Sequence, residues 1–165
     1  QLLPLGFKYF LEVFPPNAPA NPHADVGRLI CDSLVRTLAG LTRAERPLFL
    51  KLPYLGPKLT EQLAAYDPSL ILGIMGGSAG TTYDSFALLA EARQYGVRAA
   101  LFGRRINNAE CQTTFVQHLR RIADGEIDPA DAVRSYHSEL QQKGITPLRS
   151  LEEDLQRHST GLSHY

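Results

Sequence analysis

Four short stretches of the chain are hydrophobic almost without interruption. They lie at residues 8–14, 47–53, 69–75 and 97–103. None shows the regular alternation of apolar and polar residues expected of a strand with one face in water. Continuous stretches of this kind are typical of strands covered on both faces, as in parallel sheets.

Amphipathic segments with helical spacing separate these stretches. The first is predicted to begin with Asn21 as its N-cap and Pro22 in its first turn, and to end at Gly40. Three more follow at about residues 59–66, 83–95 and 107–124. The strand–helix unit therefore occurs four times, which predicts right-handed crossovers and a parallel α/β sheet.

Two further helices are predicted after the fourth unit. Asp128 and Pro129 begin one that runs to about Lys143, and residues 150–153 have the pattern of a capping box for a short last helix. We expect residues 1–157 to form a single α/β domain and residues 158–165 to be a frayed tail.

Length and charge narrow the architecture and the partners. The 165 residues, 44% of them hydrophobic, suffice for one core, whereas a complete (β/α)8 barrel needs about 250 residues. Lys and Arg total 17, as do Asp and Glu, so no net charge favours nucleic acid or a membrane surface. No apolar stretch approaches the roughly 20 residues of a membrane span. The first residues lack the features of a signal peptide, and we expect a cytoplasmic protein.

Cysteines and histidines show no pattern of a disulfide framework or a metal site. Cys31 and Cys111 both fall in predicted helices, and we expect them to be buried or half-buried thiols. The histidines lack the spacing of metal ligands, so we expect no metal or cofactor. We expect all five to face solvent: His23, His118, His137, His158 and His164.

Unusual residues stand near the carboxyl ends of all four predicted strands, where functional groups gather in parallel α/β folds. Glu12 belongs to the first strand, and Lys51 lies between leucines in the second. The third runs into Gly76-Gly77-Ser78-Ala79-Gly80, and the fourth ends in Gly103-Arg104. Periodicity alone fits an open flavodoxin-like domain equally well. This clustering instead favours the C-terminal half of a (β/α)8 barrel, with about four βα units followed by helices.

Each of these features has a chemical and a structural interpretation. A lysine at a barrel mouth can form a Schiff base with a carbonyl substrate, while Glu12 moves protons. Alternatively, Lys51 and Glu12 form a structural ion pair in a non-catalytic binding or regulatory protein. The glycine-rich turn lets backbone N–H groups approach an anion, and Gly103-Arg104 would complete the cradle. Otherwise the glycines serve backbone geometry alone.

Four short motifs follow one another along the chain and form an ordered series. They are Leu-Glu-Val at 11–13, Leu-Lys-Leu-Pro at 50–53, Gly-Gly-Ser-Ala-Gly at 76–80 and Phe-Gly-Arg at 102–104. This order is the feature that the chain shares with a known family. The series resembles the class I aldolases of the tagatose-bisphosphate aldolase and DhnA type, the DeoC/LacD group. The resemblance covers about residues 8–125 and implies the last four units of a (β/α)8 barrel. It implies that Lys51 is the Schiff-base lysine and Glu12 the acid that assists proton transfer. The substrate-phosphate site that it implies consists of Gly76, Gly77, Ser78, Ala79, Gly103 and Arg104.

The chain departs from the family pattern at Gly80-Thr81-Thr82-Tyr83 and at residues 104–108, which leaves the substrate open. We expect a class I aldolase-like lyase of carbohydrate metabolism that acts on a phosphorylated carbonyl compound. A half barrel exposes unpaired strand edges and apolar lumen surface. We therefore expect it to pair with a missing N-terminal half or with a second copy, and to have little activity alone.

Overall fold

The computed structural model describes residues 6–18, 20–21, 24–77 and 80–158. Its strands, each inside a predicted stretch, are β1 (Leu11–Glu12), β2 (Phe49–Leu52), β3 (Ile71–Met75) and β4 (Ala99–Leu101). They form one sheet in the order β1-β2-β3-β4, and every neighbouring pair is parallel. The predicted parallel α/β sheet is therefore confirmed.

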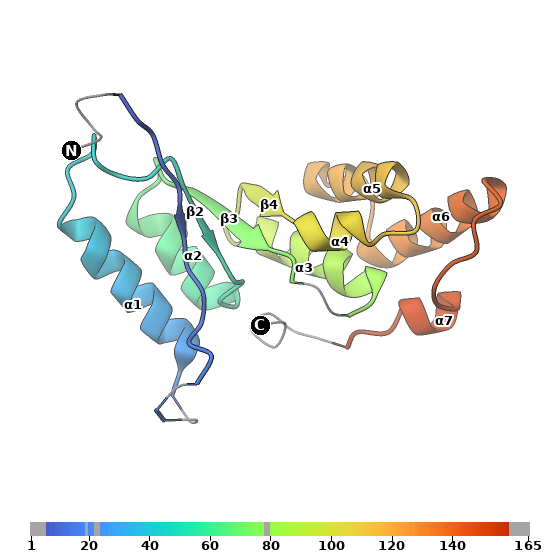
Figure 1. Ribbon diagram of the computed structural model, residues 1–165, viewed down its shortest axis with the longest axis horizontal. Helices are drawn as coiled ribbons and strands as arrows, with labels where there is room; N and C mark the ends of the chain where they lie inside the picture. The colour runs from blue at the N-terminus through green and yellow to red at the C-terminus, as the bar shows by residue number, and fades with distance from the viewer. Residues whose placement is uncertain (1–5, 19, 22–23, 78–79, 159–165) are drawn as a thin grey trace.

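Helices follow the strands along the chain (Figure 1). They are α1 (Val26–Ala39), α2 (Pro57–Tyr66), α3 (Thr82–Gln94), α4 (Gly103–Asn107), α5 (Gln112–Asp124), α6 (Pro129–Gln142) and α7 (Leu151–Asp154). The predicted N-cap Asp128 accepts a hydrogen bond from the N–H of Ala130. Both hydrogen bonds of the predicted capping box are present at Ser150 and Glu153. None of the helices in the described residues is long and apolar enough to cross a membrane.

Two predicted helix starts were wrong. The first helix begins at Val26, because the Asp25 carboxylate accepts a hydrogen bond from the N–H of Arg28 at 2.9 Å and caps the helix there. Asn21 lies in the preceding turn, where its carbonyl accepts from the N–H of Ala24 at 3.1 Å, and Pro22 lies outside the described residues. The helix predicted from residue 107 begins instead at Gln112, as α5, and Asn107 is the last residue of the short helix α4.

The strand order follows the chain order, so each crossover advances the sheet by one strand in the same direction. Crossovers of one hand that all advance in the same direction place the connecting helices on one face. In agreement, α1 packs on α2, α2 on α3, and α3 on both α5 and α6. A flavodoxin-like sheet reverses its strand order at a switch point, whereas this four-stranded sheet does not.

The core lies between the sheet and these helices. Its sheet side consists of side chains that are at most 2% exposed: Leu50, Leu52, Leu72 and Ile74. Farther along the helix layer, Phe86 on α3 packs against Phe115 on α5 with ring centroids 5.2 Å apart. Tyr136 on α6 meets Phe115 edge-on at 5.7 Å, so these rings join three helices.

The prediction that all histidines face solvent was wrong for His118 and His137, which are 1% and 5% exposed. His118 lies on the same stripe of α5 as Phe115 and Ile122, and its Nδ1 is 2.9 Å from the carbonyl of Thr114. This local hydrogen bond satisfies one polar atom and allows the ring to be buried.

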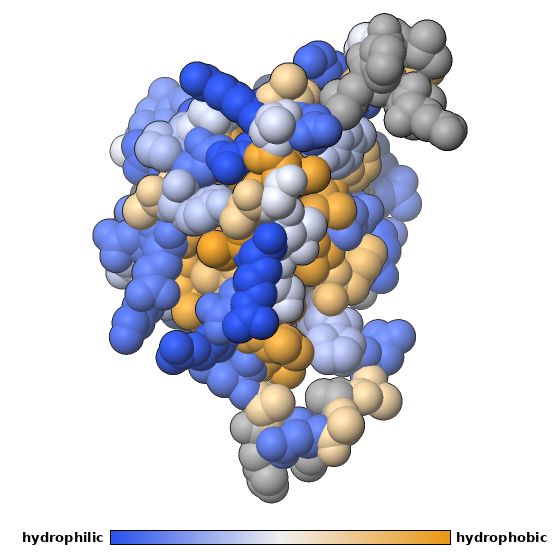
Figure 2. Space-filling model, turned by 90° about the vertical axis from the view of Figure 1, so that its left-hand side faces the viewer, coloured by the Kyte–Doolittle hydropathy of each residue, from blue (hydrophilic) through white to orange (hydrophobic). Residues whose placement is uncertain are grey.

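Apolar side chains on the opposite face of the sheet remain uncovered by any helix of the described residues. Phe10 stacks on Phe49 with centroids 4.8 Å apart, yet Phe10 is 50% exposed and Ile71 37% exposed. Beside the β1 edge, an apolar groove of about 440 Å³ lies between β1 and α1. Figure 2 shows hydrophobic surface open between hydrophilic side chains on one side of the molecule.

Candidate functional site

Parallel pairing brings the two predicted catalytic side chains together. Glu12 and Lys51 are register partners in β1 and β2, and paired residues of neighbouring strands project to the same face. The Lys51 Nζ atom lies 2.6 Å from Glu12 Oε1. The two side chains are 26% and 29% exposed, so this ion pair is open to solvent rather than sealed in the core.

The ion pair borders a cavity of about 300 Å³ at the carboxyl ends of the strands. Six predicted site residues line it: Glu12, Lys51, Gly76, Gly77, Gly103 and Arg104. Phe14, Met75 and Leu101 complete the lining. Ser78 and Ala79 lie outside the described residues. The structure thus places amine, carboxylate, glycine turn and guanidinium around one space.

Two of the glycines have a structural reason to be glycine. A Cβ atom on Gly76 would approach Phe102 Cδ1 to 2.5 Å, and Gly77 has a φ of +64°. Such a φ is costly for residues with a side chain. Backbone geometry therefore accounts for both residues, and their role in binding a phosphate stays a prediction.

Adjacent arginines after β4 have different surroundings. Arg104 is exposed and lines the cavity. Arg105 instead donates from Nε to Ser85 Oγ at 2.6 Å and from its other nitrogens to the carbonyls of Gly80 and Thr81. Burial, followed by the nearby charge of Arg149, lowers the pKa of Arg105. Arg105 thus holds the turn between β3 and α3 in place through these hydrogen bonds, a role that the sequence did not indicate.

A buried carboxylate holds the start of α3 from a distant part of the chain. Asp154 Oδ1 accepts a hydrogen bond from the N–H of Thr82 at 2.7 Å, and its Oδ2 lies 3.0 Å from His137 Nε2. The side chains of Asp154 and His137 are 3% and 6% exposed. No local sequence motif indicates these two contacts, because Asp154, His137 and Thr82 belong to three different helices and lie 17 and 72 residues apart.

Residues after Asp154 strengthen the same contact. Thr81 Oγ1 donates to the carbonyl of Gln156 at 2.8 Å, and Asp84 Oδ1 accepts from the N–H of His158 at 3.0 Å. In Figure 1 the chain runs back from α7 toward the sheet. Of the predicted frayed tail, His158 is bonded in this way and residues 159–165 lie outside the described residues.

The two cysteines are free, with Cys31 buried and Cys111 half-buried, as predicted. Hydrogen bonds with Thr114, and then the charge of Lys143, lower the pKa of Cys111. Burial, and then the neighbouring Asp32, raises the pKa of Cys31. Neither thiol lines the cavity that holds Lys51.

Within the described ranges, no three His, Cys, Asp or Glu side chains form a group that could hold a metal ion. Comparison of the chain with protein-family models, curated protein sequences and solved structures found no match.

Proposed function

We propose that the chain carries the Schiff-base half of a (β/α)8 barrel lyase that acts on a phosphorylated carbonyl compound. The observation that carries this proposal is the shared cavity, which collects Lys51, Glu12, Gly77 and Arg104 at the carboxyl ends of parallel strands. This is the end of a barrel where active sites lie. The resemblance of the same residues to class I aldolases supports the assignment.

The 2.6 Å contact between Lys51 Nζ and Glu12 Oε1 suits proton transfer in both directions. Glu12 takes a proton from Nζ, and the neutral amine attacks the substrate carbonyl carbon to give a carbinolamine. Glu12 then returns the proton to the carbinolamine hydroxyl, which leaves as water and produces the protonated imine. The bond between the α and β carbons then breaks: its electron pair moves to the protonated imine and gives an enamine, Glu12, again a carboxylate, takes the proton of the β-hydroxyl group, and the β carbon leaves as an aldehyde.

Arg104 and the backbone of Gly77 are the groups that we assign to the substrate phosphate. An exposed guanidinium can bind two phosphate oxygens at once, and Arg104 borders the cavity that holds Lys51. Arg105 is committed to Ser85 and the β3–α3 turn, so Arg104 is the arginine of this pair that is placed to reach a ligand.

Reductive trapping tests the proposal. Incubation with dihydroxyacetone phosphate and cyanoborohydride is expected to add the reduced ligand to the Lys51 peptide, as seen by mass spectrometry. Unphosphorylated dihydroxyacetone is expected to label it more slowly, and Lys51→Ala to abolish specific labelling. Equal labelling of the wild-type protein and Lys51→Ala would reject the mechanism.

The second candidate is a non-catalytic barrel scaffold in which Lys51 and Glu12 serve as a structural pair. The close contact between the two groups favours it, since a lysine held by a carboxylate is a common structural element. This candidate predicts that Lys51 is modified no faster than exposed Lys58 in the trapping experiment.

We further propose that the uncovered sheet face and the groove beside β1 bind four more βα units, either from an N-terminal half-barrel or from a second copy. Closing the sheet into a barrel would pair the β1 edge and bury Phe10 and Ile71. By light scattering, the isolated chain is expected to form a dimer, and Phe10→Lys/Ile71→Lys a monomer. A wild-type monomer that binds no hydrophobic dye would contradict this proposal.

A further inference from the structure

The cavity that holds Lys51 has an apolar wall as well as charged groups. The polar side chains in its described lining are those of Glu12, Lys51 and Arg104. Three glycines belong to the lining as well, and the remaining side chains are apolar: Phe14, Met75 and Leu101. The order of the strands determines which part of a substrate meets this apolar wall.

The three charged residues follow the order of the strands. Glu12 belongs to β1 and Lys51 to β2, whereas Arg104 lies directly after β4. β3 therefore lies between the strand of the amine and the strand that leads to the guanidinium, and the carboxylate flanks the amine on the other side. A substrate that reaches both Lys51 and Arg104 crosses β3.

Met75 and Leu101 are the side chains that such a substrate meets. They are the last residues of β3 and β4, and they are paired in register. Lys51 pairs with Gly73, which lies two residues before Met75, so the side chains of Lys51, Met75 and Leu101 project to the same face of the sheet. Met75 is 5% exposed, and its thioether is only a weak hydrogen-bond acceptor. The path across β3 is therefore apolar.

Gly73 allows Leu101 to lie beside the lysine. A Cβ atom on Gly73 would be 2.8 Å from Leu101 Cδ1 and 3.1 Å from the carbonyl oxygen of Leu50. Gly73 is not among the glycines with a positive φ, so the backbone conformation does not require a glycine there. The leucine methyl group instead occupies the space of the missing side chain, next to the strand position of Lys51. The absent side chain thus brings an apolar group close to the amine.

We infer, on the basis of the proposed function, that the carbon chain between the carbonyl and the phosphate of the substrate carries no hydroxyl group. Arg104 holds the phosphate, the carbon chain lies on Met75 and Leu101, and Lys51 binds the carbonyl carbon. A hydroxyl group on that chain would leave water for a surface whose side chains give it no hydrogen bond, which is costly. The substrate is thus a deoxy keto phosphate rather than a polyhydroxylated sugar phosphate.

The same arrangement places the bond that breaks on the other side of the carbonyl. Glu12 flanks Lys51 from β1, away from β3 and Arg104. The α and β carbons then lie toward β1, where Glu12 takes the proton of the β-hydroxyl group and the aldehyde leaves. Glu12 returns this proton to the α carbon of the enamine, and water hydrolyses the resulting imine to release a methyl ketone phosphate.

Reductive trapping of two ketones on the whole chain tests this substrate class. 5-Phosphooxypentan-2-one has only methylene groups between carbonyl and phosphate, and its 3-hydroxy derivative adds one hydroxyl group to that chain. The rate at which cyanoborohydride labels the Lys51 peptide is divided by the rate for N-acetyllysine in solution, which removes the intrinsic reactivity of each ketone. The ketone without the hydroxyl group is expected to label Lys51 about tenfold faster, because the apolar wall disfavours a hydroxyl group.

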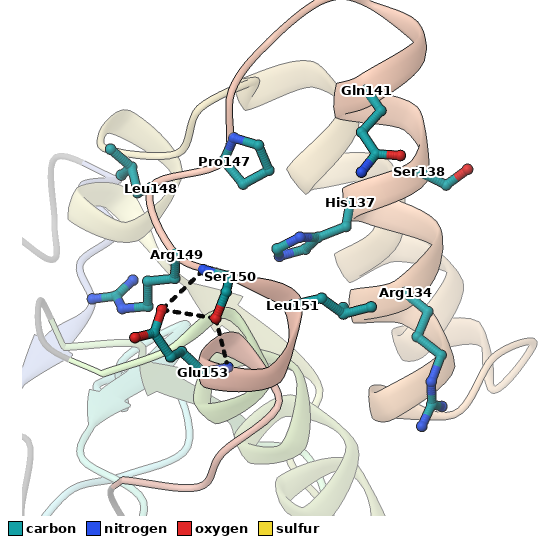
Figure 3. Close-up of a pocket in the computed structure, with 10 residues that line it drawn as sticks. All are labelled: Arg134, His137, Ser138, Gln141, Pro147, Leu148, Arg149, Ser150, Leu151 and Glu153. Carbon is teal, nitrogen blue, oxygen red and sulfur yellow. Dashed lines mark hydrogen bonds between the residues drawn. The ribbon is translucent and has the colours of Figure 1, made fainter.

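A substitution in the wall is expected to remove this preference. Leu101→Asn supplies an amide of similar size that can pair with the hydroxyl group, so the two rates are expected to become similar. The matched control is Leu148→Asn, the same exchange at a leucine that is 72% exposed. Figure 3 shows Leu148 at a second cavity, between α6 and the segment 147–153. It does not line the cavity that holds Lys51, and its replacement is expected to keep the wild-type preference.

Equal normalised rates for the two ketones in the wild-type protein would overturn the deoxy substrate, as would a preference that Leu101→Asn leaves unchanged. Labelling by dihydroxyacetone phosphate but by neither of the longer ketones would also overturn it, since a chain that crosses β3 then does not fit the cavity. In these cases the Schiff base stands. If none of the three ketones labels Lys51, the Schiff base itself is rejected, and the substrate class with it.

Discussion

Replacement of Asp154 by alanine is expected to lower the free energy of unfolding by about 3–5 kcal/mol, the cost of removing one member of a buried pair. The substitution leaves the His137 ring and the N–H of Thr82 without their present acceptor. Both groups are then buried without compensation, which is costly in a water-poor site. Urea denaturation followed by circular dichroism measures the change.

Two variants serve as controls for this experiment. Asp131→Ala removes an exposed carboxylate that also pairs with a side chain of α6, and it is expected to cost less than about 1 kcal/mol. Asp154→Asn keeps an oxygen that can accept from Thr82, so its stability should lie between those of the wild-type protein and Asp154→Ala. If Asp154→Ala is no less stable than Asp131→Ala, the buried pair is not a major support of α3.

Replacement of Glu12 by glutamine is expected to slow reductive trapping of dihydroxyacetone phosphate by about 10²–10⁴-fold, the usual contribution of a general acid–base group. Glutamine preserves the size of the side chain but can neither take the Nζ proton nor return it to the carbinolamine. The rate is measured as the appearance of labelled Lys51 under single-turnover conditions.

The control for this variant is Glu61→Gln, which changes an exposed residue of α2 and should trap at the wild-type rate. If Glu12→Gln stays within about twofold of the wild-type rate, Glu12 does not carry the proton. If Glu12→Gln traps at the wild-type rate and Lys51→Ala does not trap, Lys51 still forms the Schiff base. The proton must then be carried by a residue other than Glu12.

The parts of the fold that the sequence predicted depend on local rules. Continuous apolar stretches located the strands, and the caps at Asp128 and Ser150 act on residues within one helical turn. Local rules do not decide where a helix begins when two residues that can serve as its N-cap lie within a few positions of each other, as Asn21 and Asp25 do. The apolar residues of α1 that pack on the core begin at Val26, so packing makes Asp25, the residue before it, the N-cap.

The candidate site was predictable to the extent that topology determines it. Parallel strands bring their carboxyl ends to one edge, so Glu12, Lys51, Gly76 and Arg104 were expected together, and they line one cavity. The burial of His137 could not be predicted, because it depends on Asp154, which lies 17 residues away in another helix. The hydrogen bonds of Arg105 to the β3–α3 turn could not be predicted for the same reason, because the partners lie 20–25 residues away along the chain.

The hydrogen bond between Thr82 and Asp154 also has a consequence for synthesis of the protein on the ribosome. Its two residues are separated by 72 positions. At about 5–20 residues per second, the carboxylate is therefore made roughly 4–14 s after the turn that it stabilises. The residues of all four strands have been made before this interval ends, but the start of α3 still lacks its distant acceptor. A chaperone that binds nascent chains would meet this turn in an incomplete state.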